Sequence, residues 1–289
     1  MVKRPAILSF FVPALSLLAS GLYANPGPAA GQDSPPPQTA AQEQRLAPGE
    51  TLTLAFPQLP PMKDGQLTTC EVRLPDTYAP DRDFPLLVWF GGGHGSATVG
   101  GAVKLVDPAT FIIVALPYPE GRRPRVAVDE GTIDEFWDYL QPMLAAVQEK
   151  VPNISKSLRI AGGTSSGAHL VGSGICQRWP GFSDYFTAYI LHEGGHAPGT
   201  DFTAAHGKPI LVVYGEQSTA YPWQQRFNQR IRQSEARITY IDLPEAGHGL
   251  TEEGRQQIRA WTDRQEARLC PDLSASPSID SHHPHKDPS

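Results

Sequence analysis

Cysteine is scarce in this chain, with three among 289 residues. Three thiols allow one disulfide and leave one thiol over. Cys176 follows small apolar residues in an expected helix, where we expect it to be a buried small hydrophobe. Cys70 falls in an expected strand and Cys270 just past the last expected helix. A bridge between these two is one open alternative, and three free thiols are the other.

Long blocks of like charge are also missing, and the net charge is −6. A chain of this charge without a basic patch is not expected to bind nucleic acid. No internal repeat is visible, and no segment beyond the N-terminal residues is apolar enough to span a membrane. The length suits one sizeable α/β domain.

The N-terminus has the pattern of a secretory signal peptide. Lys3 and Arg4 precede an apolar run, 5–22, that Pro13 interrupts, and small residues ending at Ala24 follow it. A basic start, a short apolar core and small residues form the signal that export machinery cleaves. We therefore expect a signal peptide over 1–24, a secreted or periplasmic location, and no membrane contact after cleavage.

Composition divides the remaining chain into three parts. Residues 25–48 are rich in Pro, Gln and Ala, which predicts a linker with too few apolar residues to pack. Residues 49–270 form the expected folded domain, and 271–289 an expected disordered tail. The three tail histidines 282, 283 and 285 lack a framework that would fix a metal, so we expect a solvated tail and no metal or cofactor.

Short apolar runs alternate with helical patterns through residues 49–270. Eight runs predict strands, the first two of them at a sheet edge: 51–56, 67–74, 85–90, 111–116, 158–161, 186–192, 208–214 and 236–243. Helical spacing is found over 132–150, 168–176, 221–233 and 251–269. The first of these helices has a capping-box pattern at its start, and Pro142 is expected to kink or restart it. The alternation predicts a mostly parallel sheet of about eight strands with helices on both faces.

The segment Gly163-Thr164-Ser165-Ser166-Gly167 carries the strongest chemical signal. It reads G-x-S-x-G between a short strand and a helix of small residues. Glycines allow the backbone to turn sharply there, so that the Ser165 hydroxyl is exposed above the sheet. This pattern makes Ser165 the candidate nucleophile.

Two glycine-containing loops accompany this elbow. Gly91-Gly92-Gly93 ends the buried run 85–90, and glycine lets backbone N–H groups approach a developing oxyanion. His248 stands in a glycine-flanked loop after the last expected strand, where an imidazole can act as general base for Ser165.

On these residues the chain resembles the α/β-hydrolase family, over about residues 50–268. Within the family it is most similar to compact, lidless secreted esterases of the feruloyl-esterase and polyhydroxybutyrate-depolymerase type. The resemblance implies an oxyanion hole formed by the N–H of Ser166 with that of Gly92 or Gly93. It implies no cofactor, and the connection 191–208 is too short for a large lid.

The family's usual triad acid is missing from its expected place. It commonly follows the next-to-last core strand, where this chain has Glu216 and then Ser218. Glu193, after the preceding strand, is the preferred alternative because some family members carry the acid there. Glu216 stays a second candidate, and the absence of any acid a third.

Two functions from different classes follow. The first is a secreted serine esterase acting on a small-molecule or polymeric ester, with Ser165 as nucleophile and His248 as base. The second is a catalytically impaired domain that binds a glycan, polymer or protein, which the Ser at position 218 favours. A peptidase is less favoured because nothing in the sequence builds a peptide-binding domain, and the oligomeric state stays open.

Overall fold

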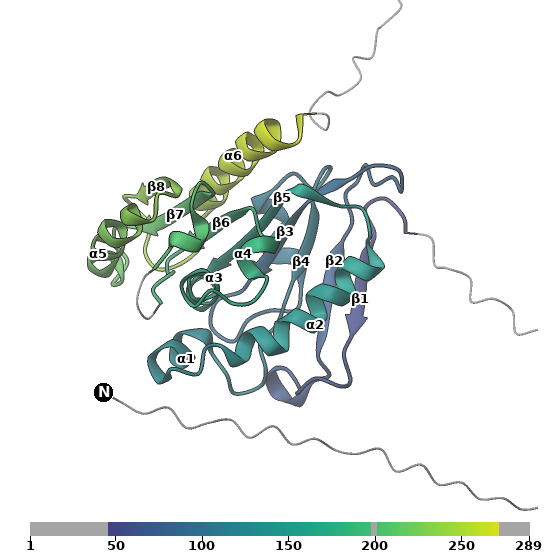
Figure 1. Cartoon of the computed structure of the whole chain (residues 1–289), viewed down its shortest axis with the longest axis horizontal. Helices are drawn as coiled ribbons and strands as arrows, with labels where there is room; N and C mark the ends of the chain where they lie inside the picture. The colour runs from purple at the N-terminus through teal and green to yellow at the C-terminus, as the bar shows by residue number, and fades with distance from the viewer. Residues whose placement is uncertain (1–45, 198–200, 272–289) are drawn as a thin grey trace, which may run out of the picture. The chain divides into compact units, whose positions relative to one another are not determined.

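The computed structural model describes residues 46–197 and 201–271, which belong to a unit that begins at Arg45. Eight strands form one sheet (Figure 1). They are β1 (Thr51–Ala55), β2 (Thr69–Arg73), β3 (Phe84–Phe90), β4 (Ile112–Ala115), β5 (Ile154–Thr164), β6 (Ala188–His192), β7 (Pro209–Gly215) and β8 (Arg237–Leu243). Their spatial order is β1-β2-β4-β3-β5-β6-β7-β8.

Six α-helices and five short 3-10 turns connect the described strands. The α-helices are α1 (Pro124–Glu130), α2 (Glu135–Lys150), α3 (Ser166–Cys176), α4 (Phe182–Tyr185), α5 (Tyr221–Ile231) and α6 (Glu252–Leu269). The 3-10 turns are η1 (Lys63–Gly65), η2 (Val99–Gly101), η3 (Val103–Leu105), η4 (Thr203–Ala205) and η5 (Arg232–Ser234).

Pairing within the sheet is antiparallel at one end and parallel elsewhere. β2 pairs antiparallel with β1 and with β4, and every pair from β4 through β8 is parallel. All residues of β3, β4, β6 and β7 are buried, as expected for parallel strands covered on both faces. The predicted architecture is confirmed: a mostly parallel sheet of eight strands between helices.

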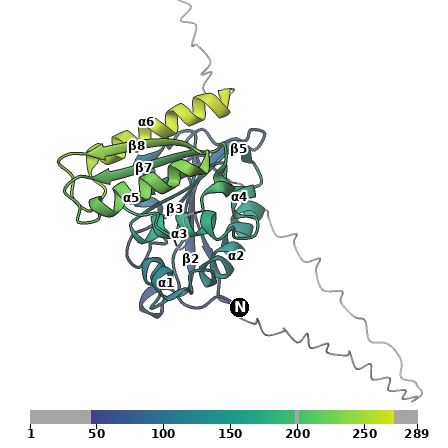
Figure 2. The ribbon, with the colours of Figure 1, turned by 60° about the vertical axis from the view of Figure 1, so that its left-hand side comes forward.

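Two hydrophobic cores lie on the two faces of the sheet. Leu86, Val88 and Phe90 of β3 pack with residues of α1 to α5 on one face. Leu87 and Trp89 point the other way and pack with residues of α6, η2 and η3. Figure 2 shows α6 and α5 on either side of β7 and β8. Because successive side chains of a strand point to opposite faces of the sheet, β3 contributes residues to both cores.

Two strand predictions need correction. The segment 67–74 was expected at an edge, yet β2 lies between β1 and β4, and the two edges are β1 and β8. β5 begins at Ile154, ahead of the expected strand 158–161, because Ile154 pairs with Phe84 across an irregularity in the β3 register. The strand therefore has 11 residues, where sequence predicted four.

The start and middle of α2 also differ from prediction. No side chain caps the helix, because the Thr132 hydroxyl and the Glu135 carboxylate both accept hydrogen bonds from Arg122 instead. The helix continues through Pro142 as one element. Proline has no N–H, so the Asp138 carbonyl, one turn before Pro142, lacks its helical hydrogen bond. Both residues lie on the exposed face of α2, where water can hydrogen-bond that carbonyl.

The three cysteines are free. Cys70 packs in the core on the α3 side and Cys270 in the core on the α6 side, so the sheet separates them and the alternative of a bridge is wrong. Burial raises the pKa of the Cys70 thiol to about 12. Cys176 lies in α3, partly buried against the core, as expected for a small hydrophobe.

The terminal predictions fall largely outside the described residues. This holds for the signal peptide 1–24, for all but the last three residues of the linker 25–48, and for the tail after Pro271 with its three histidines. Among the helices of the described ranges, none is both long and apolar enough to cross a membrane.

Candidate active site

Three strands that end at the same edge of the sheet deliver the candidate catalytic residues. Ser165 follows β5, Glu193 follows β6, and His248 lies in the loop after β8. Because β5 through β8 run parallel, their carboxyl ends meet at one edge, which is where open α/β sheets bind ligands. Residues more than 80 positions apart are thereby brought into contact.

Ser165 occupies a strained turn. Its backbone has φ 51° and ψ −114°, a conformation that non-glycine residues rarely adopt. The turn closes because its flanking glycines have no side chain. A Cβ on Gly167 would lie 2.0 Å from the Phe90 carbonyl oxygen, and one on Gly163 would lie 2.4 Å from the Gly167 carbonyl carbon. The G-x-S-x-G spacing thus has a steric cause in this chain.

His248 bridges the other two residues. Its Nε2 lies 3.0 Å from Ser165 Oγ, and its Nδ1 lies 3.1 Å from Glu193 Oε2. A carboxylate oxygen accepts hydrogen bonds, so Nδ1 carries the proton and Nε2 keeps the lone pair facing the hydroxyl. This tautomer is the one a general base for Ser165 requires.

The Glu193 carboxylate is enclosed and fully hydrogen-bonded. Its side chain is 0% exposed, whereas that of His248 is 50% exposed. Oε1 accepts from the Gly215 backbone N–H and Oε2 from the Ser218 hydroxyl, each at 2.6 Å. Ser218, at the position where the family pattern places its acid, therefore hydrogen-bonds the acid that follows β6.

Glu216 lies away from this chain of contacts. It is exposed, and its carboxylate forms no hydrogen bond or ion pair with any residue in the described ranges. Of the two carboxylates that the sequence left open, Glu193 is the one beside His248.

A second histidine, His192, lies directly before Glu193. It is fully buried and bonded through Nδ1 to the Thr164 hydroxyl at 2.6 Å. Burial, with a smaller contribution from the charge on His248, lowers the pKa of His192 to about 3. Because His192 stays neutral at ordinary pH, it adds no positive charge beside Glu193 that would compete with a protonated His248.

The glycine loop after β3 lies against the nucleophile. A Cβ on Gly92 would lie 3.5 Å from the Ser165 Cβ, so the two residues are neighbours. The Tyr118 hydroxyl donates to the Gly91 carbonyl at 2.7 Å and fixes the start of the loop. Ser166 is the first residue of α3, so its N–H has no acceptor within the helix. Gly92 and Ser166, two of the three predicted oxyanion residues, thus adjoin Ser165.

A cavity of about 530 Å³ opens beside Ser165 and His248. Its other lining residues are Arg125, His169, Glu193, His196, Tyr214, Thr219, Ala220, Trp223 and Arg230. Sequence reasoning missed both arginines. Arg125 lies on α1, a helix whose signals were present in Pro124 at its first position and Gly131, with φ 74°, at its end. His196, in the connection 191–208, is part of the lining.

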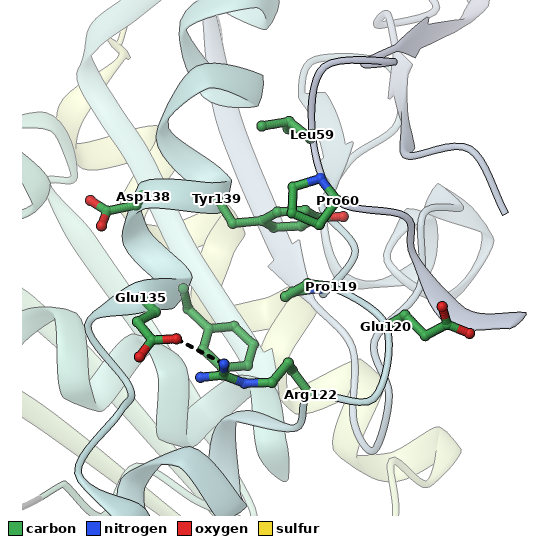
Figure 3. Close-up of a pocket in the computed structure, with 9 residues that line it drawn as sticks. Leu59, Pro60, Pro119, Glu120, Arg122, Glu135, Asp138 and Tyr139 are labelled. Atoms are coloured by element: carbon green, nitrogen blue, oxygen red, sulfur yellow. Dashed lines mark hydrogen bonds and ion pairs between the residues drawn. The ribbon is translucent and has the colours of Figure 1, made fainter. Parts of the chain in front are cut away.

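A second cavity, of about 500 Å³, lies between α2 and the two loops that carry Pro60 and Pro119 (Figure 3). Glu120, Glu135 and Asp138 are at its rim, and Arg122 is bonded to Glu135 at 2.8 Å. In the described ranges, no three His, Cys, Asp or Glu side chains gather as metal ligands do.

Comparison with known proteins gives matches at the level of structure. No protein-family model matches the sequence, and no curated protein matches it either. A fungal esterase from Rhizomucor miehei is 15% identical with a TM-score of 0.55, over 80% of this chain and 87% of its own. The fluorophosphonate-binding serine hydrolase F of Staphylococcus aureus is 14% identical with a TM-score of 0.54, over 76% and 99%.

The feruloyl esterase module of Clostridium thermocellum is similar to the same degree. It is 14% identical with a TM-score of 0.53, over 74% of this chain and 87% of that one. Identities this low establish the fold. The chain has the α/β-hydrolase fold and resembles the esterases built on it.

Proposed function

We propose that this protein is a serine hydrolase that cleaves carboxylic esters through an acyl-enzyme on Ser165. One observation carries the proposal: a hydrogen-bonded chain runs from the buried Glu193 carboxylate through His248 to the Ser165 hydroxyl. Such a chain activates a hydroxyl that is otherwise a weak nucleophile at neutral pH.

In the first half-reaction, Ser165 Oγ attacks the ester carbonyl while His248 Nε2 takes the hydroxyl proton. The carbonyl oxygen becomes an oxyanion, and the N–H of Ser166 with that of Gly92 or Gly93 stabilises it. As the intermediate collapses, the bond to the alcohol breaks and His248 returns its proton to the departing alkoxide. Alcohol leaves, and the acyl group stays on Ser165.

Water completes the cycle by the same route. His248 takes a proton from water, the hydroxide adds to the acyl carbonyl, and the Ser165–acyl bond breaks with the proton returning to Oγ. Glu193 stabilises the imidazolium in both halves, and its complete burial makes that interaction stronger than a solvated pair.

The impaired-domain alternative depended on the absence of an acid after β7. The contact between Glu193 and His248 supports the esterase over this alternative, because it offers the candidate base a carboxylate from the end of β6. The structural neighbours support the proposal by analogy, since their names describe esterases and a fluorophosphonate-binding serine hydrolase.

A fluorophosphonate probe tests the proposal directly. Wild-type protein is expected to be labelled and to hydrolyse short-chain aryl esters, and Ser165→Ala is expected to lose both while its circular dichroism and melting temperature stay close to wild type. Ser166→Ala is the matched control, because the oxyanion contact uses its backbone N–H. An unlabelled wild-type protein would overturn the esterase proposal and restore the binding alternative; labelling at Ser166 would show that the wrong serine was chosen.

Export is the second part of the proposal. If residues 1–24 act as a signal peptide, the mature chain begins close to Asn25 and acts on esters outside the cytoplasm. Mass spectrometry of the mature protein measures its N-terminus. An intact Met1 on cytoplasmic protein would contradict this part and leave the chemistry of Ser165 unaffected.

A further inference from the structure

The cavity beside Ser165 is lined by more positive than negative charge. Arg125 of α1 and Arg230 of α5 both line it, and Glu193 is the carboxylate among its lining residues. Glu193 is already bound by His248, Ser218 and the Gly215 N–H. The Glu193 carboxylate is therefore already paired with the imidazole, and no other residue of the lining offers an anion to the two arginines.

Neither arginine has a strong partner among the described residues. Arg230 is exposed, and its guanidinium forms no hydrogen bond or ion pair with them. Arg125 pairs with Asp129, one turn further along α1, at 3.3 Å, and the two side chains are 50% and 59% exposed. A pair so exposed contributes little and is easily exchanged, so both guanidinium groups are available to a ligand.

Two of the three histidines that line the cavity, His169 and His196, do not add to this positive charge. Burial, with Arg125 as a smaller contributor, lowers the pKa of His169 to about 3. The pKa of His196 is lowered mainly by burial and further by Arg125 and Arg230. Both imidazoles are neutral at ordinary pH, and both respond to Arg125. Apart from His248, which takes part in the proposed chemistry, the positive charge of the cavity therefore comes from the two arginines.

One wall of the cavity is apolar. Trp223 of α5 is 59% exposed, the most exposed large hydrophobic residue in the described part of the chain, and Ala220 lies beside it in the lining. The Arg226 guanidinium lies over the indole ring, 4.0 Å from its centroid, and the rest of this exposed side chain offers a surface for hydrocarbon. The cavity therefore joins an apolar wall to two available cations.

We propose that this cavity selects esters that carry a carboxylate, which Arg125 and Arg230 bind while the apolar part of the substrate lies on Trp223. The inference rests on the proposed function and adds the substrate class to it. Guanidinium groups bind carboxylates through paired N–H···O bonds, and no neutral ester can supply the matching acceptors.

The second cavity of the molecule has the opposite character and supplies the control. Arg122 there is already bonded to Glu135, and two further carboxylates, Glu120 and Asp138, lie at the rim (Figure 3). Removing the Arg122 charge changes the protein's net charge by the same amount as removing Arg125 or Arg230. It leaves the cavity beside Ser165 untouched.

The test compares charged and neutral forms of one ester. For an acyl-side carboxylate the pair is para-nitrophenyl hydrogen glutarate and its methyl ester; for an alcohol-side carboxylate it is para-butyryloxybenzoate and its methyl ester. We expect wild-type protein to prefer the charged member of one pair in kcat/KM. Arg125→Gln and Arg230→Gln should each lower that preference about tenfold, and together about a hundredfold. Arg122→Gln should leave it unchanged, and added salt should weaken it.

The outcomes separate this inference from the proposed function. If both members of a pair are hydrolysed and the double arginine variant keeps the wild-type preference in kcat/KM, the carboxylate site is overturned and the esterase proposal stands. Hydrolysis of neither member overturns the esterase. In that case calorimetry with Ser165→Ala decides the site alone: glutarate should bind, glutaramide should not, and the double arginine variant should lose glutarate.

Discussion

The ends of β6 and β7 lie side by side in the sheet, yet their loops differ in what they give the site. The loop after β6 supplies a carboxylate, Glu193. The last residue of β7, Gly215, supplies a backbone N–H and the loop after β7 supplies the Ser218 hydroxyl, and both hold this carboxylate. In the family pattern the acid comes from the second of these loops. The comparison teaches that, under the proposed function, His248 takes its carboxylate from the end of β6, while the end of β7 holds that carboxylate in place.

Each loop has local features that suit its contact with the carboxylate. Glu193 takes a left-handed backbone conformation, φ 53°, and its N–H bonds the Val213 carbonyl of β7 at 3.0 Å. Ser218 is small, so it leaves room for the longer glutamate side chain beside it. Its hydroxyl also accepts from the Ala220 N–H at 3.2 Å, which orients the O–H toward Glu193.

Removing the charge at the end of β6 should have the largest effect. Glu193→Gln places an amide against His248 Nδ1, favours the wrong imidazole tautomer and removes stabilisation of the imidazolium. We expect kcat to fall about 10³- to 10⁴-fold with KM nearly unchanged, measured on an aryl ester. A loss below tenfold would mean that His248 works without an acid.

Moving the acid from β6 to β7 sharpens the comparison. Ser218→Asp alone puts two carboxylates in hydrogen-bond contact within a buried site, so we expect about a hundredfold loss of turnover and a lower melting temperature. Combining it with Glu193→Ser leaves one carboxylate on the β7 side. This double variant should be more active than Glu193→Ser alone; equal rates would show that β7 cannot serve His248 in this chain.

Removing the hydroxyl at the end of β7 should have a moderate effect. Ser218→Ala deletes one hydrogen bond to a buried carboxylate, a contact that contributes about 1.5–3 kcal/mol. Glu193 keeps the Gly215 N–H and His248, so we expect kcat to fall about tenfold. Ser218→Thr keeps a hydroxyl and should recover part of the rate, which a purely steric role for Ser218 does not predict.

The smallest effect is expected at Glu216. Its exposed carboxylate has no contact with His248, so Glu216→Gln should change kcat/KM less than twofold, within the usual range for surface substitutions. A loss comparable to that of Glu193→Gln would reverse the assignment of the acid. Both variants carry the same chemical change, one strand apart.

The sequence predicted those parts of the molecule that depend on local pattern. Continuous apolar runs located the buried strands, and the glycines around Ser165 located the turn because their absence of side chains is a steric requirement. Two parts depend on contacts across the fold and were missed. β5 is longer than predicted because Ile154 pairs with β3, and Arg125 lines the cavity because α1 packs against α3.

The candidate triad acid likewise depended partly on local pattern and partly on contacts across the fold. Pattern alone left three alternatives for the acid: Glu193 and Glu216, which both follow core strands, and no acid at all. The choice between them depends on where each carboxylate points and on which is enclosed, and neither property is local. Glu193 is buried against Ser218 and Gly215, while Glu216 lies in solvent.

Two of the three residues in the hydrogen-bonded chain, Ser165 and Glu193, have positive φ angles, 51° and 53°. Such backbone costs about 1–3 kcal/mol at each position, and glycine would relieve it. The proposed chemistry needs a side chain at both positions, so the domain is less stable than the same fold with glycine there would be.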